Sequence, residues 1–275
     1  MTDHSVDVGL SVAPAPWKLR GRWWVFLLSP LPKDVSFPAG WTTEWQADAL
    51  ARDEFVGGPG VIMVVQYDES PVGPYDELIY VPGRFKHKDG SVAFRITRIY
   101  VSTKDSTENG RRNWNIPKQV AKFEYTRDPS SPYSWSLSVF PVPEDPSEDS
   151  TPFFSATVRP IPLVTNVLHV PCNTKIIPGN LFSLTQPPLP KGPLAEEIES
   201  GVEITEGPQL NKKAKYAKLS PEVKCKMFLV NMTPELGNGT AVGDGVMFPA
   251  VKPWSIAAGV EGFDLTFPVS EWVEL

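Results

Sequence analysis

The amino-acid sequence predicts a mainly β protein, a β-barrel or sandwich type of scaffold with a few short helices. Short apolar runs of strand length are separated by turn residues about every 8–12 positions. The chain also contains 30 prolines among 275 residues, about twice the average usage, and prolines this dense interrupt long helices. Its nine tryptophans suit a sizeable apolar interior or pocket.

The composition excludes several classes of protein. Hydrophobic residues make up 41% of the chain and charged residues 21%, as in a globular protein with a real core. The net charge of −6 argues against nucleic acid as a partner, because phosphate binding needs a basic face. No apolar run approaches the length of a membrane span, and the N-terminus lacks a secretory signal pattern. We therefore expect a cytoplasmic protein without a membrane partner.

Cysteine and histidine are too scattered for a metal site. The two cysteines lie far apart, and the three histidines show no metal-ligand spacing. These residues are Cys172, Cys225, His4, His87 and His169. We expect neither a metal nor a cofactor.

The first half of the chain predicts an arm, four strands and one weak helix. Residues 1–16 are polar and then rich in Ala and Pro, which predicts a flexible N-terminal arm, and residues 17–275 are interpreted as a single β domain. A weak helical pattern at 41–55 ends at the Gly-Gly-Pro-Gly run. Strands are predicted at 17–28, 61–67, 75–81 and 91–101, with a hairpin tip at 86–90.

The second half predicts further short strands. An acidic loop at 143–150 and a Pro-rich connector at 187–193 interrupt them. The connector is either a domain boundary or a long loop within one sheet system. Strands are predicted at 123–125, 134–140, 153–158, 164–170, 182–185, 215–219, 226–231, 246–251 and 262–268.

The stretch from Gly110 to Lys118 is the first candidate site. It places Arg111, Arg112 and Trp114 close to a single lysine. A lysine amine is a nucleophile only when it is neutral, and burial or a nearby cation favours that state. The competing interpretation is a surface lysine beside a proline, which is the usual place for lysine.

Two further charged residues are candidates for catalysis or substrate binding. Glu77 follows a Pro/Gly turn and precedes an apolar strand, so its carboxylate could be directed at a substrate or could move protons. Arg22 lies inside an aromatic strand and could bind a substrate carboxylate bidentately. The alternatives are a solvated glutamate at a strand start and an arginine on the wet face of its strand.

Together these residues resemble the acetoacetate decarboxylase family. Tyr75-Asp-Glu77 is similar to its Tyr-x-Glu segment, and Arg111 is followed seven residues later by Lys118 in a Pro-Lys pair. The resemblance covers roughly residues 17–125 and implies a curved β-barrel or cone around an internal pocket. It also implies that Lys118 forms a Schiff base, with Glu77 and Arg22 catalytic and with Tyr75, Arg111 and Trp114 contacting substrate. The family commonly forms homo-oligomers.

Two positions depart from the family pattern. The lysine that follows the Schiff-base lysine is Gln119 here, and an acidic position fifteen residues before Glu77 is Ile62. The resemblance thus implies a lyase-type enzyme acting on a hydrophobic keto or β-keto substrate, as in secondary metabolism. Decarboxylation, aldol or dehydration chemistry and isomerisation all stay open.

Two interpretations from other classes compete with an enzyme of this kind. The first is a non-covalent pocket protein that binds a hydrophobic ligand or guides a cyclisation. The second is an interaction module built on Pro-rich loops.

Overall fold

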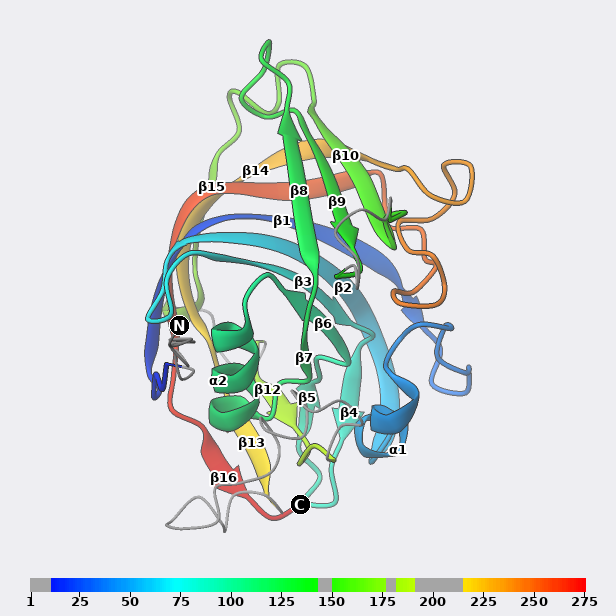
Figure 1. The fold of residues 1–275 in the computed structure, drawn as a ribbon, viewed down its shortest axis with the longest axis vertical. Coiled ribbons are helices and arrows are strands. Elements are labelled where there is room, and N and C mark those ends of the chain that lie inside the picture. The colour runs from blue at the N-terminus through cyan, green and yellow to red at the C-terminus, as the bar shows by residue number, and fades with distance from the viewer. Residues whose placement is uncertain (1–10, 143–149, 177–181, 191–214) are drawn as a thin grey trace, which may run out of the picture.

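The computed structural model describes residues 11–142, 150–176, 182–190 and 215–275. Over these residues the chain is mainly β, as the sequence predicts, and Figure 1 shows long curved strands arching over one helix. The first eight strands are β1 (Trp17–Leu31), β2 (Glu54–Glu69), β3 (Tyr75–Val81), β4 (Arg84–Lys86), β5 (Val92–Phe94), β6 (Arg98–Val101), β7 (Lys118–Val120) and β8 (Lys122–Arg127). The others are β9 (Trp135–Phe140), β10 (Phe154–Pro160), β11 (Val170–Asn173), β12 (Leu184–Gln186), β13 (Tyr216–Leu219), β14 (Glu222–Pro234), β15 (Ile256–Phe267) and β16 (Glu271–Val273).

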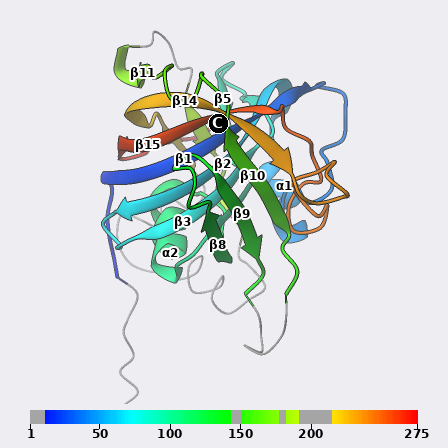
Figure 2. The ribbon, with the colours of Figure 1, turned by 90° about the horizontal axis from the view of Figure 1, so that it is seen from above.

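The strands of the described residues form one 16-stranded sheet. Its path runs β16-β13-β12-β5-β4-β2-β1-β15-β14-β10-β9-β8, with β3, β6 and β7 branching from β2 and with β11 beside β14. The two ends of this path are not joined, so the sheet curves without closing into a barrel. The long strands β1, β2, β14 and β15 form the arch that is visible from above in Figure 2.

Within the described residues, four short helical segments accompany the sheet. They are η1 (Glu44–Gln46), α1 (Ala47–Leu50), α2 (Lys104–Trp114) and η2 (Thr174–Ile176). The weak helical pattern at 41–55 therefore yields only η1 and α1. Helix α2 was not predicted, because its sequence is largely polar and shows no apolar stripe of helical period. It begins after Thr103, whose side chain accepts from the Ser106 N–H at 3.3 Å.

Apolar side chains cover both faces of the sheet. The face toward strands β8 to β10 carries the convex-side core, and the face toward α2 carries the concave-side core. The convex-side core includes Trp24, Phe26, Ile62, Val64, Tyr80, Tyr100, Leu137 and Phe154. The concave-side core includes Trp17, Leu19, Val65, Tyr67, Tyr75, Ile99, Trp114 and Phe263. Because side chains alternate along a strand, odd-numbered residues of β3 face α2 and even-numbered ones face away.

Two predicted strands are turns in the structure. Residues 161–168 form successive turns, closed by the Leu168 N–H bonding the Val164 carbonyl at 2.8 Å, and β11 begins only at Val170. Residues 246–251 contain no strand, because one carboxylate oxygen of Asp244 accepts the N–H groups of Val246, Met247 and Phe248. Local polar bonds thus replace the strand ladder that the apolar runs suggest.

The predicted N-terminal arm is partly held in place. The N–H of Ala13 donates to the Asn109 side chain of α2 at 2.8 Å, and the N–H of Ser11 donates to Asp105 at 3.2 Å. Residues 11–16 therefore pack along α2, contrary to a flexible arm over that range, whereas residues 1–10 lie outside the described residues. So do most of the predicted acidic loop and the end of the Pro-rich connector.

No helix in the described parts of the chain is both long and apolar enough to cross a membrane.

Candidate active site around Lys118

Lys118 is positioned by the turn that ends α2. Asn115 takes the left-handed conformation (φ 53°), which reverses the chain after the helix. Lys118 then pairs with Ile99 at the start of β7, and the Arg111 Nε donates to the Lys118 carbonyl at 2.8 Å. A Cβ at Gly110 would lie only 2.5 Å from the Lys118 Cδ, so glycine allows the lysine side chain to pass beneath the helix.

The Lys118 amine is part of a buried polar cluster. It donates to the Glu77 Oε1 at 2.5 Å and to the Ser106 Oγ at 2.9 Å. The Tyr67 hydroxyl donates to the other oxygen of Glu77 at 3.1 Å. Lys118 and Glu77 are only 3% and 4% exposed. An amine and a carboxylate in direct contact, away from water, can exchange a proton without solvent.

Aromatic rings surround this amine. The Tyr75 ring centre lies 5.0 Å from the Lys118 Nζ and the Trp17 ring centre lies 5.9 Å from it. Both distances are within the range at which a ring face attracts a cation. Trp114 packs edge-on against Trp17, and its indole N–H donates to the Pro268 carbonyl at 2.8 Å. Trp114 therefore builds the wall of the cluster, and its polar atom already has a partner.

Tyr67 and Tyr75 both keep their hydroxyl protons near neutral pH. Burial and then the charge of Glu77 raise the pKa of Tyr67 well above its usual value, and the same two causes raise the pKa of Tyr75. Their hydroxyls therefore stay protonated. The Tyr67 bond keeps the Glu77 carboxylate oriented toward the amine.

The structure brings together most of the residues that the sequence singled out. Lys118, Glu77 and Tyr75 lie in one cluster, and Trp114 forms its wall. Arg111, however, points at the Lys118 backbone, with its guanidinium over the Trp45 ring at 5.8 Å. Arg112 pairs with Glu108. Arg111 is thus bonded to the Lys118 backbone, and its contact with substrate stays a prediction.

Arg22 does not join this cluster, which corrects the expectation drawn from the resemblance. It pairs across β1 and β2 with Gln66, which in turn pairs with Asp76. Asp76 precedes Glu77 on β3, and neighbouring residues of a strand point to opposite faces of the sheet. The side chains of Arg22, Gln66 and Asp76 therefore lie on the face opposite to Glu77. There the Arg22 guanidinium lies 3.9 Å from Glu261 and over the Trp135 ring.

The two departures from the family pattern also lie on the convex side. Gln119 pairs with Tyr100, and Ile62 pairs with Tyr80, and both tyrosines belong to the convex-side core. The side chains of Gln119 and Ile62 therefore point to the opposite face of the sheet from the Lys118 amine. Besides Glu77 and Tyr75, the surroundings of the amine include residues that the sequence alone did not indicate.

Those missed residues are Ser106, Tyr67 and Trp17. Ser106 lies on the unpredicted helix. Tyr67 was detectable, because a hairpin joining 61–67 to 75–81 places it opposite Tyr75 and hence on the face of Glu77. Trp17 approaches from the first residue of β1, and nothing local in the sequence marks that contact.

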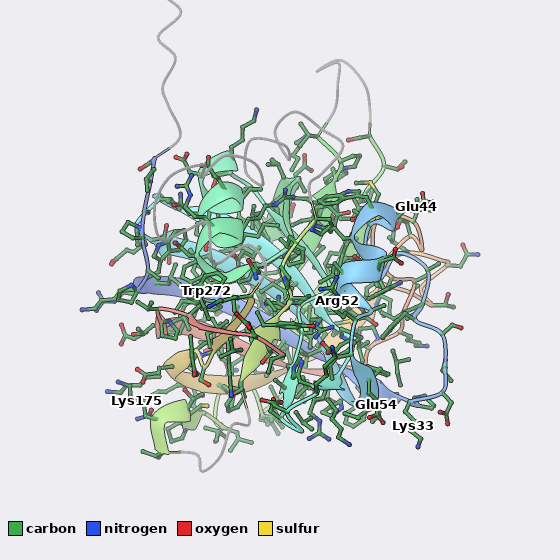
Figure 3. All side chains as sticks on the ribbon, turned by 90° about the horizontal axis from the view of Figure 1, so that it is seen from below. Lys33, Glu44, Arg52, Glu54, Lys175 and Trp272 are labelled. Atoms are coloured by element: carbon green, nitrogen blue, oxygen red, sulfur yellow. The ribbon has the colours of Figure 1, made fainter. Side chains whose placement is uncertain are left out.

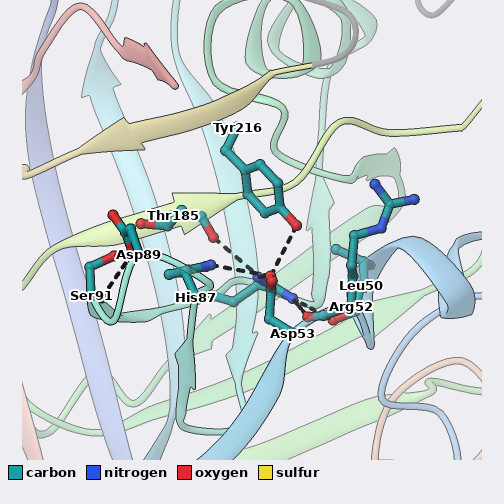
Figure 4. A network of polar contacts seen from close by, with 9 residues as sticks. Leu50, Arg52, Asp53, His87, Asp89, Ser91, Thr185 and Tyr216 are labelled. Atoms are coloured by element: carbon teal, nitrogen blue, oxygen red, sulfur yellow. Dashed lines mark hydrogen bonds and ion pairs between the residues drawn. The ribbon is translucent and has the colours of Figure 1, made fainter. Parts of the chain in front are cut away.

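A second buried polar cluster lies around Asp53 (Figure 4). One Asp53 oxygen accepts from Arg95 at 2.7 Å and from Tyr216 at 3.1 Å, and lies 3.2 Å from the His87 Nδ1. Burial lowers the pKa of His87, so its ring is neutral near neutral pH. Arg95 also donates to the Leu50 carbonyl at 3.0 Å. These bonds tie the end of α1 to β4, β5 and β13, which is a structural role.

Within the described residues, no three His, Cys, Asp or Glu side chains come together in a way that could hold a metal ion.

The sequence matches curated proteins over a short segment. No family model matches the sequence. A 64-residue segment is 33% identical to Protein NEOXANTHIN-DEFICIENT 1 of Arabidopsis thaliana, covering 23% of this chain and 22% of that protein. The match thus spans less than a quarter of this curated relative.

Solved structures match over nearly the whole chain. A structure of acetoacetate decarboxylase has a TM-score of 0.57 at 10% identity, covering 95% of this chain and 91% of that one. The enduracididine biosynthesis enzyme MppR, complexed with pyruvate, has a TM-score of 0.51 at 12% identity, covering 96% and 92%. At these identities the likeness concerns the fold. It confirms the curved, mainly β architecture that the resemblance implied.

Proposed function

We propose that this chain, which has the fold of acetoacetate decarboxylase, is a small-molecule enzyme that acts on a keto or β-keto substrate through the amine of Lys118. The observation that carries the proposal is the contact of this buried amine with a carboxylate and a hydroxyl. A lysine placed only for packing would leave its charge at the surface. Here the charge is internal, beside a group able to take its proton.

The reaction begins with proton transfer. Glu77 accepts a proton from the Lys118 ammonium along their 2.5 Å contact, which leaves a neutral amine. The nitrogen lone pair then attacks the substrate carbonyl carbon. The carbonyl oxygen leaves as water with two protons, one from the attacking nitrogen and one from Glu77. The resulting iminium draws electrons from the bond to a departing carboxyl group or α-proton. Glu77, a carboxylate again, can take an α-proton and return it, whereas after decarboxylation the carbon takes a proton from water. Water then hydrolyses the product iminium and frees the Lys118 amine. Tyr67 keeps Glu77 oriented.

The substrate is a hydrophobic keto compound in this proposal, as in secondary metabolism. The rings of Tyr75 and Trp17 next to the amine favour an apolar body, and Arg22 is on the other face of the sheet. MppR, which shares the fold, has been crystallised with pyruvate, a keto acid. Decarboxylation, aldol or dehydration chemistry and isomerisation share the iminium and differ in the bond that is then broken or formed.

A non-covalent pocket protein is the second candidate. It is favoured by the closure of the site, since the Lys118 amine is already engaged by Glu77 and Ser106. The relative from Arabidopsis thaliana also bears a name that refers to neoxanthin rather than to a keto acid. In this case the cluster would bind a hydrophobic ligand or guide a cyclisation, and Lys118 would serve as a hydrogen-bond donor.

Borohydride trapping separates the two candidates. The protein is incubated with β-keto acids and diketones of increasing size, reduced, digested and analysed by mass spectrometry. An adduct on Lys118 that is lost in Lys118→Ala, but kept in the exposed control Lys122→Ala, supports the enzyme. Absence of an adduct with every carbonyl compound, together with full activity of Lys118→Ala, would reject it.

Glu77→Gln tests the proton transfer separately. Glutamine can still accept from Tyr67 but cannot take the ammonium proton. We expect turnover to fall by at least about 100-fold, with substrate affinity changed by less than about threefold. An unchanged turnover would show that Glu77 takes no part in the proton transfer.

A further inference from the structure

The sheet places the two cysteines of the chain directly opposite each other. Cys172 and Cys225 are the only cysteines of the chain and lie far apart in its sequence. Cys172 is on β11, Cys225 is on β14, and the two are partners in the antiparallel register of these strands. Both thiols are free. Because directly opposite residues share a face of the sheet, the two side chains point the same way.

The spacing of directly opposite residues suits a disulfide. In an antiparallel pair their Cα atoms lie about 4.5 or 5.5 Å apart, depending on the hydrogen-bonding pattern. Disulfides span Cα separations of about 4.4–6.8 Å, so both values fall within range. Burial and then the neighbouring Cys172 thiol raise the pKa of Cys225 to about 12, so the two thiols already interact. The strands therefore need no new register for the sulfurs to bond.

The two cysteines differ in their access to solvent. Cys225 is 8% exposed and belongs to the concave-side core, whereas Cys172 is half-buried and packs against that core. A small oxidant in solution therefore meets Cys172 first, and Cys225 is the neighbour that can react with it next. Packing alone would explain Cys225, because a buried free cysteine behaves as a small hydrophobic residue. It would not explain why the second cysteine lies opposite.

Strand β11 is held to the sheet by few interactions. It is four residues long, and within the described residues it pairs only with β14. The adjoining η2 is held by the Thr174 hydroxyl, which accepts from the Val223 N–H at 2.8 Å, and by the exposed pair of Lys175 with Glu222. Figure 3 shows Lys175 on η2 at the edge of the molecule. Exposed ion pairs add little, so a short strand of this kind opens more easily than the long strands of the arch.

We propose that Cys172 and Cys225 form a reversible disulfide when the chain meets hydrogen peroxide, and that this bond locks β11 onto β14. The Cys172 thiolate attacks one peroxide oxygen, the O–O bond breaks, and the other oxygen leaves as hydroxide and takes up the thiol proton. Cys172 is then a sulfenic acid. The Cys225 sulfur attacks the Cys172 sulfur, the S–O bond breaks, and the oxygen leaves as water with the Cys225 proton. Two thiols are oxidised and one peroxide is reduced to two waters.

This modification is independent of the reaction proposed at Lys118, and non-reducing peptide mass spectrometry tests it on the full chain. The reduced protein is treated with hydrogen peroxide, unreacted thiols are blocked with N-ethylmaleimide, and the digest is analysed before and after dithiothreitol. We expect one cross-linked peptide pair that joins Cys172 to Cys225 within a single chain and that dithiothreitol separates.

Single variants distinguish the two thiols. In Cys225→Ala, dimedone should label the sulfenic acid of Cys172 at least about tenfold more than in wild type, where Cys225 removes it. In Cys172→Ser, Cys225 should stay unoxidised because it is buried.

Hydrogen exchange tests the locking of β11. Peptides covering residues 161–176 should exchange at least about fivefold more slowly in oxidised than in reduced wild type. Peroxide should not change their exchange in Cys172→Ser, which controls for oxidation of methionine. The wild-type results decide the proposal even where a variant does not fold. Oxidised wild type without the cross-link, cross-links only between two chains, or equal exchange in the oxidised and reduced protein would each overturn it.

Discussion

Replacement of Gly110 by alanine should have opposite effects on stability in two backgrounds. In the wild-type chain the new Cβ would lie 2.5 Å from the Lys118 Cδ and 2.7 Å from its Cε. Lys118 is only 3% exposed and cannot simply move aside. Over-packing of this kind costs about 1–3 kcal/mol, which outweighs the gain of roughly 1 kcal/mol from alanine in a helix. We expect a net loss of up to about 2 kcal/mol.

The second background is Lys118→Ala/Glu77→Gln. It removes the Cδ and Cε of position 118 and also the carboxylate, so no unpaired charge stays buried. With the obstacle gone, Gly110→Ala should stabilise the chain by about 0.5–1 kcal/mol through helix propensity alone.

Urea unfolding followed by tryptophan fluorescence measures both effects. The unfolding midpoint should shift in opposite directions while the denaturant slope is unchanged. Shifts of the same sign in both backgrounds would refute the packing of Lys118 beneath Gly110. In the wild-type background, Gly110→Ala should also abolish borohydride trapping, because the amine is displaced from Glu77.

Three further predictions follow from residues outside this contact. Arg22→Ala should leave trapping at Lys118 within about twofold of wild type, and a large loss would contradict its place on the convex side of the sheet. Because burial lowers the pKa of His87 in the folded state, the unfolded chain binds the extra proton first. Stability should therefore fall as pH drops from about 7 towards 5, and His87→Gln should reduce that slope by at most about 1.4 kcal/mol per pH unit in urea titrations. Burial raises the pKa of Cys225 to about 12, so iodoacetamide near pH 8 should modify Cys172 first and Cys225 only after unfolding, as peptide mass spectrometry can check.

The sequence predicted which candidate residues lie together where local spacing and strand alternation carry the information. Tyr75 and Glu77 are two residues apart on a strand, so they share a face, and Lys118 follows a Pro at a strand start. Tyr67 could have been added from the hairpin register. The mainly β class followed from proline content and turn spacing.

What the sequence could not supply depends on contacts between distant segments. Ser106 reaches the amine only because a polar helix forms, and that helix has no apolar stripe to reveal it. Arg22 could not be assigned to a face, since β1 carries aromatic residues on both of its sides. The strand predicted at 164–170 was wrong because exposed and buried valines look alike in the sequence.

The crystal structure of the borohydride-reduced adduct with a hydrophobic diketone tests the central claim most directly. We expect a covalent bond from the Lys118 Nζ to the former carbonyl carbon, with Glu77 and the Tyr75 ring in contact with the ligand and with the Arg22–Glu261 pair undisturbed. A ligand held elsewhere, or held in the concave-side core without a bond while the Lys118–Glu77 contact stays intact, would contradict the account.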